Sequence, residues 1–123
     1  MQSPPQRSQP ARNIMAIWKK ASSVFAGGTE QVKKLKGRRI RALVNLELAI
    51  YDPINGKQAI TAISQGETGL VSNHHPTTFD FLLAFPSNTS TLVTSLDALM
   101  RTGKFKVVVV NEPTFKAQFE IEG

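Results

Sequence analysis

The stretch IRALVNLELAIYDPINGKQAITAIS, residues 40–64, contains two apolar runs separated by a turn. Apolar side chains occupy every second position of residues 40–50, which is the period of a strand with one buried face. Pro53 presets the φ of a turn, and Asn55-Gly56 tolerates positive φ. The sequence therefore predicts a hairpin in which one long strand, residues 40–50, pairs with residues 58–64.

The residues after this hairpin predict further strands. Residues 79–86 are apolar on both faces, which is typical of a central strand or of one covered by a helix or a partner. Short runs at 70–73 and 105–110 predict two more strands. Residues 115–122 alternate strictly between apolar and polar side chains, and we interpret them as a half-buried strand.

One short helix is predicted at residues 96–102. Thr94 or Ser95 is a suitable N-cap, and Gly103 is a suitable end. Leu96, Leu99 and Met100 are expected to face inward. Because the connections are short, we expect a small α+β, mainly-β domain with about six largely antiparallel strands.

The N-terminal third differs in composition. Residues 1–13 are rich in Pro, Gln, Ser and Arg and predict a disordered arm. Residues 14–39 are interpreted as an amphipathic basic helix and a basic linker, because apolar residues recur at helical spacing from Ile14 to Phe25. Residues 40–123 form the predicted β-rich domain. The sequence contains no internal repeat that would suggest another boundary.

Charge is distributed unevenly along the chain. The formal net charge is +6, but residues 1–41 carry +9 and residues 42–123 carry −3. A basic segment on a mildly acidic body indicates a polyanionic partner, or docking of the arm on the body of a neighbouring molecule. A basic tail that only improves solubility is the alternative interpretation.

Two sets of candidate site residues follow from this pattern. The basic side chains beside and within the segment VKKLKGRRIR are predicted to bind the polyanion: Lys19, Lys20, Lys33, Lys34, Lys36, Arg38, Arg39 and Arg41. The apolar stripe of the predicted helix is expected to contact a membrane or a partner: Ile14, Ile17, Trp18 and Phe25.

Signals for catalysis or metal binding are weak. The chain contains no cysteine, and its adjacent histidines, His74 and His75, would point in opposite directions on an extended segment. The carboxylates are dispersed, and no serine stands in a nucleophile motif. We therefore predict no enzyme activity, no metal site and no cofactor.

The layout is that of a non-enzymatic structural or assembly protein, similar in plan to viral matrix or nucleocapsid proteins. The expected partners are nucleic acid, bound without sequence preference, an anionic membrane, or both, together with further copies of the chain as a homo-oligomer. The alternative is a soluble adaptor or regulator whose arm is a partner-binding or nuclear-localisation segment. Without a secretory signal or an apolar span, an intracellular location is expected: cytoplasm, nucleus, inner membrane face or virion.

Overall fold

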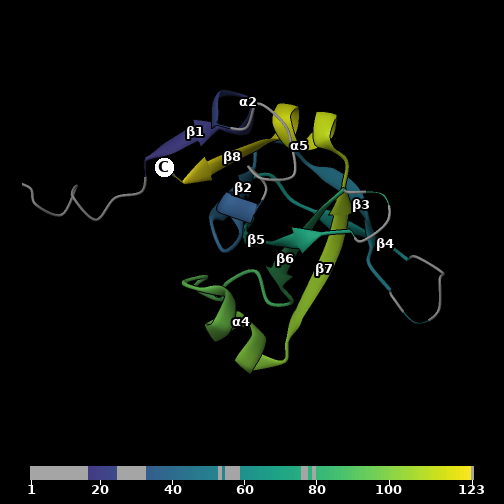
Figure 1. The fold of residues 1–123 in the computed structure, drawn as a ribbon. Helices are drawn as coiled ribbons and strands as arrows, with labels where there is room; N and C mark the ends of the chain where they lie inside the picture. The colour runs from purple at the N-terminus through teal and green to yellow at the C-terminus, as the bar shows by residue number, and fades with distance from the viewer. Residues whose placement is uncertain are drawn as a thin grey trace, which may run out of the picture.

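The computed structural model describes residues 17–24, 33–52, 54, 59–75, 78 and 80–122. In this part of the chain eight strands form one sheet, and every strand pair is antiparallel (Figure 1). The order across the sheet is β1-β8-β2-β5-β6-β7-β3-β4. The predicted mainly-β, antiparallel architecture is confirmed, although the sheet has eight strands instead of about six.

The element bounds are as follows. The strands are β1 (Trp18–Lys20), β2 (Arg39–Ala42), β3 (Leu46–Ile50), β4 (Ile60–Ile63), β5 (Thr68–His74), β6 (Phe81–Pro86), β7 (Phe105–Val110) and β8 (Phe119–Glu122). The helices are short: α2 (Ala21–Val24), α4 (Leu96–Thr102) and α5 (Glu112–Gln118).

Only the second half of the hairpin predicted at residues 40–64 is present: β3 pairs with β4, but the predicted long strand is interrupted at residues 43–45 and its first half pairs outside the hairpin. β2 pairs with β5, β3 pairs with β4, and one register runs through both halves, from Arg39 opposite Leu70 to Ala49 opposite Ile60. The chain bends at residues 43–45, opposite a turn in which Gly66 adopts a φ of 87°. In the sheet, β6 and β7 lie between β5 and β3. The bend between β2 and β3 therefore lets the sheet curl around its own core.

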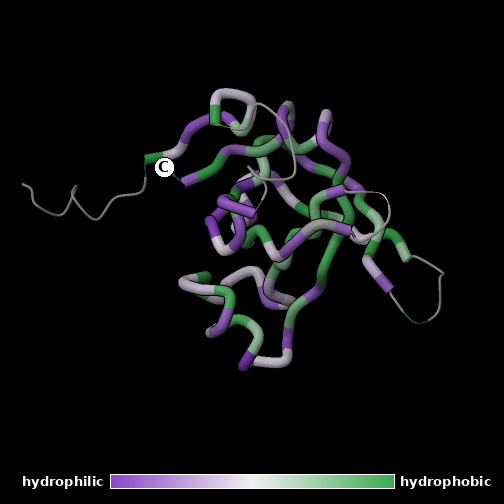
Figure 2. The backbone as a smooth tube through the Cα atoms, in the orientation of Figure 1, coloured by the Kyte–Doolittle hydropathy of each residue, from purple (hydrophilic) through white to green (hydrophobic). Residues whose placement is uncertain are grey.

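The inner face of the curled sheet holds the larger apolar cluster. Its aromatic centre is Phe81 of β6, stacked on Phe115 of α5 with ring centroids 4.0 Å apart. All six residues of β6 are buried, which confirms the predicted central strand. Figure 2 shows the neighbouring strand β7 as largely hydrophobic along its length.

A second, smaller cluster lies on the outer face under α4. Leu99 of the helix packs with Leu70 and Ala84 of the sheet. The predicted helix bounds are confirmed, because the Ser95 side chain accepts a hydrogen bond from the Ala98 N–H at 3.1 Å and Gly103 ends the helix at a φ of 66°. The expected inward position of Met100 is wrong, since this residue is exposed.

The predicted amphipathic helix is not formed where the structure describes its residues. Trp18–Lys20 is the edge strand β1, paired with β8, and only Ala21–Val24 is helical. A short isolated helix is marginal, whereas the edge of β8 offers a row of unsatisfied N–H and C=O groups. Ala21 is fully buried in the core, so this segment packs as part of the sheet.

The predicted strand at residues 115–122 is wrong in its first half. Residues Glu112–Gln118 form helix α5, and only Phe119–Glu122 is a strand. Asn111 caps the helix, accepting a hydrogen bond from the Thr114 N–H at 2.9 Å, and Pro113 suits its first turn. Phe115 and Phe119 are four residues apart, a spacing that a helix also places on one side, and their rings stack in the core.

Candidate polyanion-binding surface

Three strands at one end of the sheet bring the charged residues together. Trp18 of β1 lies opposite Glu122 of β8, and Lys20 lies opposite Glu120. On the other side of β8, Arg41 of β2 also lies opposite Glu120. Because alternate residues of a strand share a face, the charged side chains of EIE and RIR and the Lys20 side chain lie on one side of the sheet. Lys19 lies opposite Ile121, so its side chain is on the other side.

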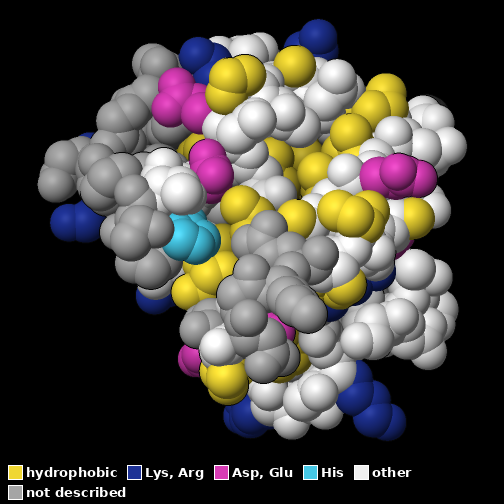
Figure 3. Space-filling model, turned by 90° about the vertical axis from the view of Figure 1, so that its right-hand side faces the viewer, with side chains coloured by type: hydrophobic (Ala, Val, Ile, Leu, Met, Phe, Trp, Pro, Cys, Tyr) yellow, Lys and Arg dark blue, Asp and Glu magenta, His cyan; other side chains and the backbone are white. Residues whose placement is uncertain are grey.

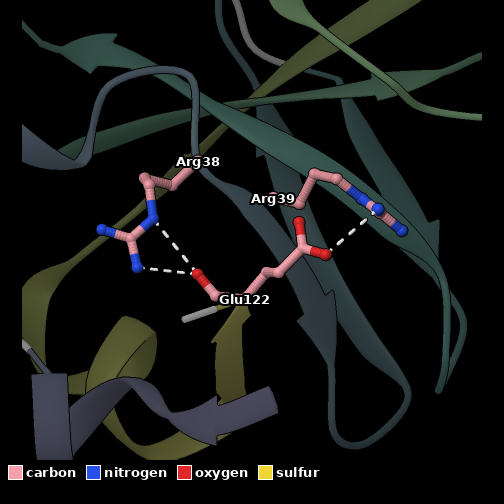
Figure 4. Close-up of polar contacts among 3 residues, drawn as sticks. All are labelled: Arg38, Arg39 and Glu122. Carbon is pink, nitrogen blue, oxygen red and sulfur yellow. Dashed lines mark hydrogen bonds and ion pairs between the residues drawn. The ribbon is translucent and has the colours of Figure 1, made fainter. Parts of the chain in front are cut away.

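The arginines of β2 are held by the glutamates of β8. The Arg41 Nε–H donates to Oε1 of Glu120 at 2.7 Å, and its Nη2 contacts the same oxygen. Arg39 forms an ion pair with Glu122, with Nη1 and Oε2 3.3 Å apart (Figure 4). These contacts fix β2 against β8 and neutralise part of the positive charge of the arginines.

Arg38 contacts the backbone of β8 instead of a carboxylate. Its Nε and Nη2 both donate to the carbonyl oxygen of Glu122, at 3.1 and 2.7 Å (Figure 4). Glu122 therefore accepts from Arg38 through its main chain and from Arg39 through its side chain. This double contact ties the start of β2 to the end of the described chain.

Trp18 is covered by two guanidinium groups. The Cζ atom of Arg41 lies 4.2 Å from the Trp18 ring centroid, and that of Arg39 lies 5.7 Å away. Both distances are within the range of a cation–π interaction. The ring is half-buried, so it holds β1 in place and is poorly placed to insert into a membrane or to stack on a base.

The predicted lysines, in contrast, are exposed. Lys19 and Lys20 extend from β1, Lys33 and Lys34 extend from the helical residues 33–35, and Lys36 lies in the turn that follows. This segment is anchored because Leu35 is buried in the core and the Gly37 N–H donates to the Val71 carbonyl at 2.7 Å. The lysines are thus mounted on a fixed backbone at the same end of the sheet as the arginines.

A shallow groove continues this surface toward α5. It is lined by Lys20 and Ser22 on one side and by Glu112, Pro113, Lys116 and Ala117 on the other. Lys20 and Lys116 place positive charge on both of its sides. An extended anion on the lysine surface would therefore meet a further cation here.

The eight predicted polyanion-binding residues fall into two groups: arginines held by β8, and exposed lysines. Among the predicted membrane or partner contacts, Ile17 is exposed and Trp18 is half-buried, while Ile14 and Phe25 lie outside the described residues, as does the predicted arm. Glu120 and Glu122 were missed as partners of the arginines. The complementary spacing of RIR and EIE is the signal that could have identified them.

Metal-ligating side chains do not cluster in the part of the chain that the structure describes. The described residues contain no group of three or more His, Cys, Asp or Glu side chains placed to hold a metal ion. None of the helices among them is long and apolar enough to cross a membrane. In comparisons with known proteins, the chain matches no protein-family model, no curated protein and no solved structure.

Proposed function

We propose that this chain is a non-enzymatic structural or assembly protein that binds nucleic acid without sequence preference and associates with further copies of itself. A matrix- or nucleocapsid-like role fits this layout. The observation that carries the proposal is a set of exposed lysines near the start of β2 and on β1. Lys33, Lys34 and Lys36 lie in the segment that leads into β2, and Lys19 and Lys20 lie on β1, with Lys20 on the same side of the sheet as the arginine–glutamate contacts.

The balance of charge at this end of the sheet supports a polyanionic partner. The predicted set contains eight Lys and Arg residues, and Glu120 and Glu122 are the carboxylates that hold two of its arginines, so the set has a net positive formal charge. Lysine ammonium groups act as point charges with flexible stems. They suit contacts with the phosphate groups, which are regularly spaced along the backbone. The sequence information lies in the bases, which these contacts do not read.

Nucleic acid fits this surface better than a membrane does. The membrane interpretation required an amphipathic helix with Trp18 on its apolar side, and Trp18 instead lies in β1 beneath Arg41. Binding through lysines alone supplies attraction to anionic lipid but no anchoring side chain from this position. The same covering of Trp18 removes a stacking platform, which favours backbone contacts over base contacts.

The test is binding of a random single-stranded RNA across a salt series. The variant Lys33→Gln/Lys34→Gln/Lys36→Gln should lower affinity, and the slope of log K against log salt should become shallower by roughly 2, at about 0.7 for each phosphate that is no longer neutralised. The matched control is Lys104→Gln, an exposed lysine beyond α4 on another part of the surface. It should leave both quantities nearly unchanged.

Three outcomes decide the proposal. An unchanged slope in the triple variant removes Lys33, Lys34 and Lys36 from the binding surface. Binding to vesicles that contain phosphatidylserine, without RNA binding at the same salt, replaces nucleic acid by lipid as the partner. Light scattering that shows a monomer at all concentrations contradicts the self-association part of the proposal.

A further inference from the structure

The strand β4 leaves one edge of the sheet open. It is the last strand in the sheet order, and no described strand pairs with its outer side. Its hydrogen bonds to β3 include the Ile50 N–H to the Ala59 carbonyl at 2.8 Å. Since partners alternate along an antiparallel strand, Thr61 and Ile63 direct their backbone groups to β3, and Ile60 and Ala62 direct theirs outward.

The strand β4 lacks several of the devices that protect an exposed edge from pairing, although it is only four residues long. Its sequence, ITAI, contains no charge and no proline, and its pairing with β3 is regular along the whole strand. Lysines, prolines and bulges are the devices that keep exposed edges from joining other strands. Ile60 is 64% exposed and Ala62 is also exposed, so the outward edge is apolar as well as unpaired.

The surroundings of this edge also favour contact with a protein surface. Figure 3 shows the side of the molecule on which β4 lies, and hydrophobic side chains gather toward the middle of that face while Lys and Arg lie nearer its rim. The lysine and arginine surface is at the β1 end of the sheet, the opposite end of the strand order from β4. A second copy can therefore approach β4 without bringing the two basic surfaces together.

The hydrogen-bonding pattern is self-complementary about Thr61. In an antiparallel pair of β4 strands centred on Thr61, Ile60 of one copy lies opposite Ala62 of the other, and both residues have outward N–H and C=O groups. A register centred on Ala62 would require the Ser64 N–H, which already donates to Glu67 Oε1 at 3.0 Å. The pairing centred on Thr61 uses only groups that face outward.

We propose that β4 pairs with β4 of a second copy about a two-fold axis at Thr61, which joins two sheets into one continuous sheet. This inference rests on the self-association part of the proposed function and names its surface. An isologous contact of this kind closes at two subunits and leaves both lysine surfaces exposed at the far ends. A dimer would present two such surfaces to one polyanion, which raises its avidity.

The axis also brings two lysines near each other. Lys106 Nζ donates to the Thr61 hydroxyl at 3.2 Å, so each copy contributes one ammonium group beside the axis. Their repulsion should weaken as salt screens it. Dimerisation through β4 is therefore expected to strengthen with salt, whereas binding of RNA to the lysine surface weakens.

A cysteine at the axis tests the register directly, because the natural chain has none. Opposed residues of a non-hydrogen-bonded pair have Cα atoms about 4.5 Å apart, within disulfide range. Thr61→Cys should give a disulfide-linked dimer under mild oxidation. Ile60→Cys is the matched control, because its two Cα atoms would be about 8 Å or more apart, beyond the roughly 7 Å limit.

A proline in the same strand gives an independent readout by sedimentation. Ala62→Pro removes an outward N–H that β3 does not use, so the monomer should keep its circular dichroism spectrum. The dimer should lose a hydrogen bond on each side of the axis, and its dissociation constant should rise by roughly tenfold or more. Ala62→Ser keeps the N–H and should change the dissociation constant by less than about twofold.

The outcomes separate this inference from the proposed function. Equal cross-linking at positions 60 and 61, or a dimer that Ala62→Pro leaves intact, overturns the β4 pairing while self-association stands. A wild-type chain that remains monomeric throughout overturns both. Failure of RNA binding with cross-linking confined to Thr61→Cys contradicts only the choice of polyanion.

Discussion

The two edge strands of the sheet, β1 and β4, differ in length and in charge. The β1 edge is three residues long, carries Lys19 and Lys20, and is attached through Trp18 to the arginines of β2. The β4 edge is four residues long, has no charged side chain, and exposes Ile60. No described strand pairs with the outer side of either edge, but only β1 has lysines in its own sequence, and these disfavour the addition of another strand.

Under the two proposals made above, the two ends of one sheet have different roles. Charge at the β1 end favours a polyanion and disfavours a second copy of the chain. The strand β4 has no charged side chain of its own, which favours a second copy, and Lys106 of β7 is the cation that contacts it. A small domain can therefore combine binding and assembly without the two surfaces competing, because the sheet separates them.

The largest expected effect on the free energy of unfolding comes from disturbing the packing of β5, in the half of the sheet that carries β1. Gly69 of β5 pairs with Ile40, and a Cβ atom there would lie 2.6 Å from the Ala84 carbonyl oxygen and 2.8 Å from the Phe85 ring. Gly69→Ala should lower the free energy of unfolding by about 3 kcal/mol, measured by urea denaturation. Ser72→Ala, in the same strand, should change it by less than about 0.5 kcal/mol, and equal effects would contradict this packing.

The next effect tests the ion pair that supports the β1 edge. Arg41→Met leaves the carboxylate of Glu120, which is 15% exposed, without its partner and should cost about 1 to 2 kcal/mol. Adding Glu120→Gln should cost less than the sum of the two single changes in a double-mutant cycle. Trp18 is the only tryptophan, so its fluorescence should change in Arg41→Met. Additive energies would show that the pair is not coupled.

A third experiment removes the difference in charge between the edges. Lys19→Thr/Lys20→Val replaces the two lysines of β1 by β-branched residues, which favour strand pairing. Sedimentation should then show association beyond a dimer, because both edges accept a strand. The control Lys33→Thr/Lys34→Val changes the net charge equally but lies in the helical residues 33–35, away from the edge. If both variants associate to the same extent, the loss of positive charge causes the association, and pairing at the β1 edge does not.

The smallest effect concerns stability at the β4 edge. Because Ile60 is 64% exposed, Ile60→Lys should change the free energy of unfolding by less than about 0.5 kcal/mol. Ile63 of the same strand is fully buried, and Ile63→Ala should cost about 3 kcal/mol. Thermal unfolding of the two variants measures this contrast. A large loss of stability in Ile60→Lys would mean that the edge is packed and closed.

Local patterns predicted the parts of the fold that neighbouring residues control. The β3–β4 half of the hairpin, the buried strand at Phe81–Pro86 and the caps of α4 were recognised, since turn residues, apolar period and capping side chains act within a few positions. The lysines among the predicted basic residues are exposed, and their binding of a polyanion stays a prediction.

Other features depended on partners far along the chain. Trp18–Lys20 is a strand because β8 offers it an edge, and Glu112–Gln118 is a helix although alternation in its sequence favours a strand. The arginines of β2 reach Glu120 and Glu122, which lie about eighty positions later. Residue types, charges and local turns were thus determined by the sequence itself. Strand pairing decided which edge is covered and which charges meet, because hydrogen bonds between strands join residues whose separation no local pattern records.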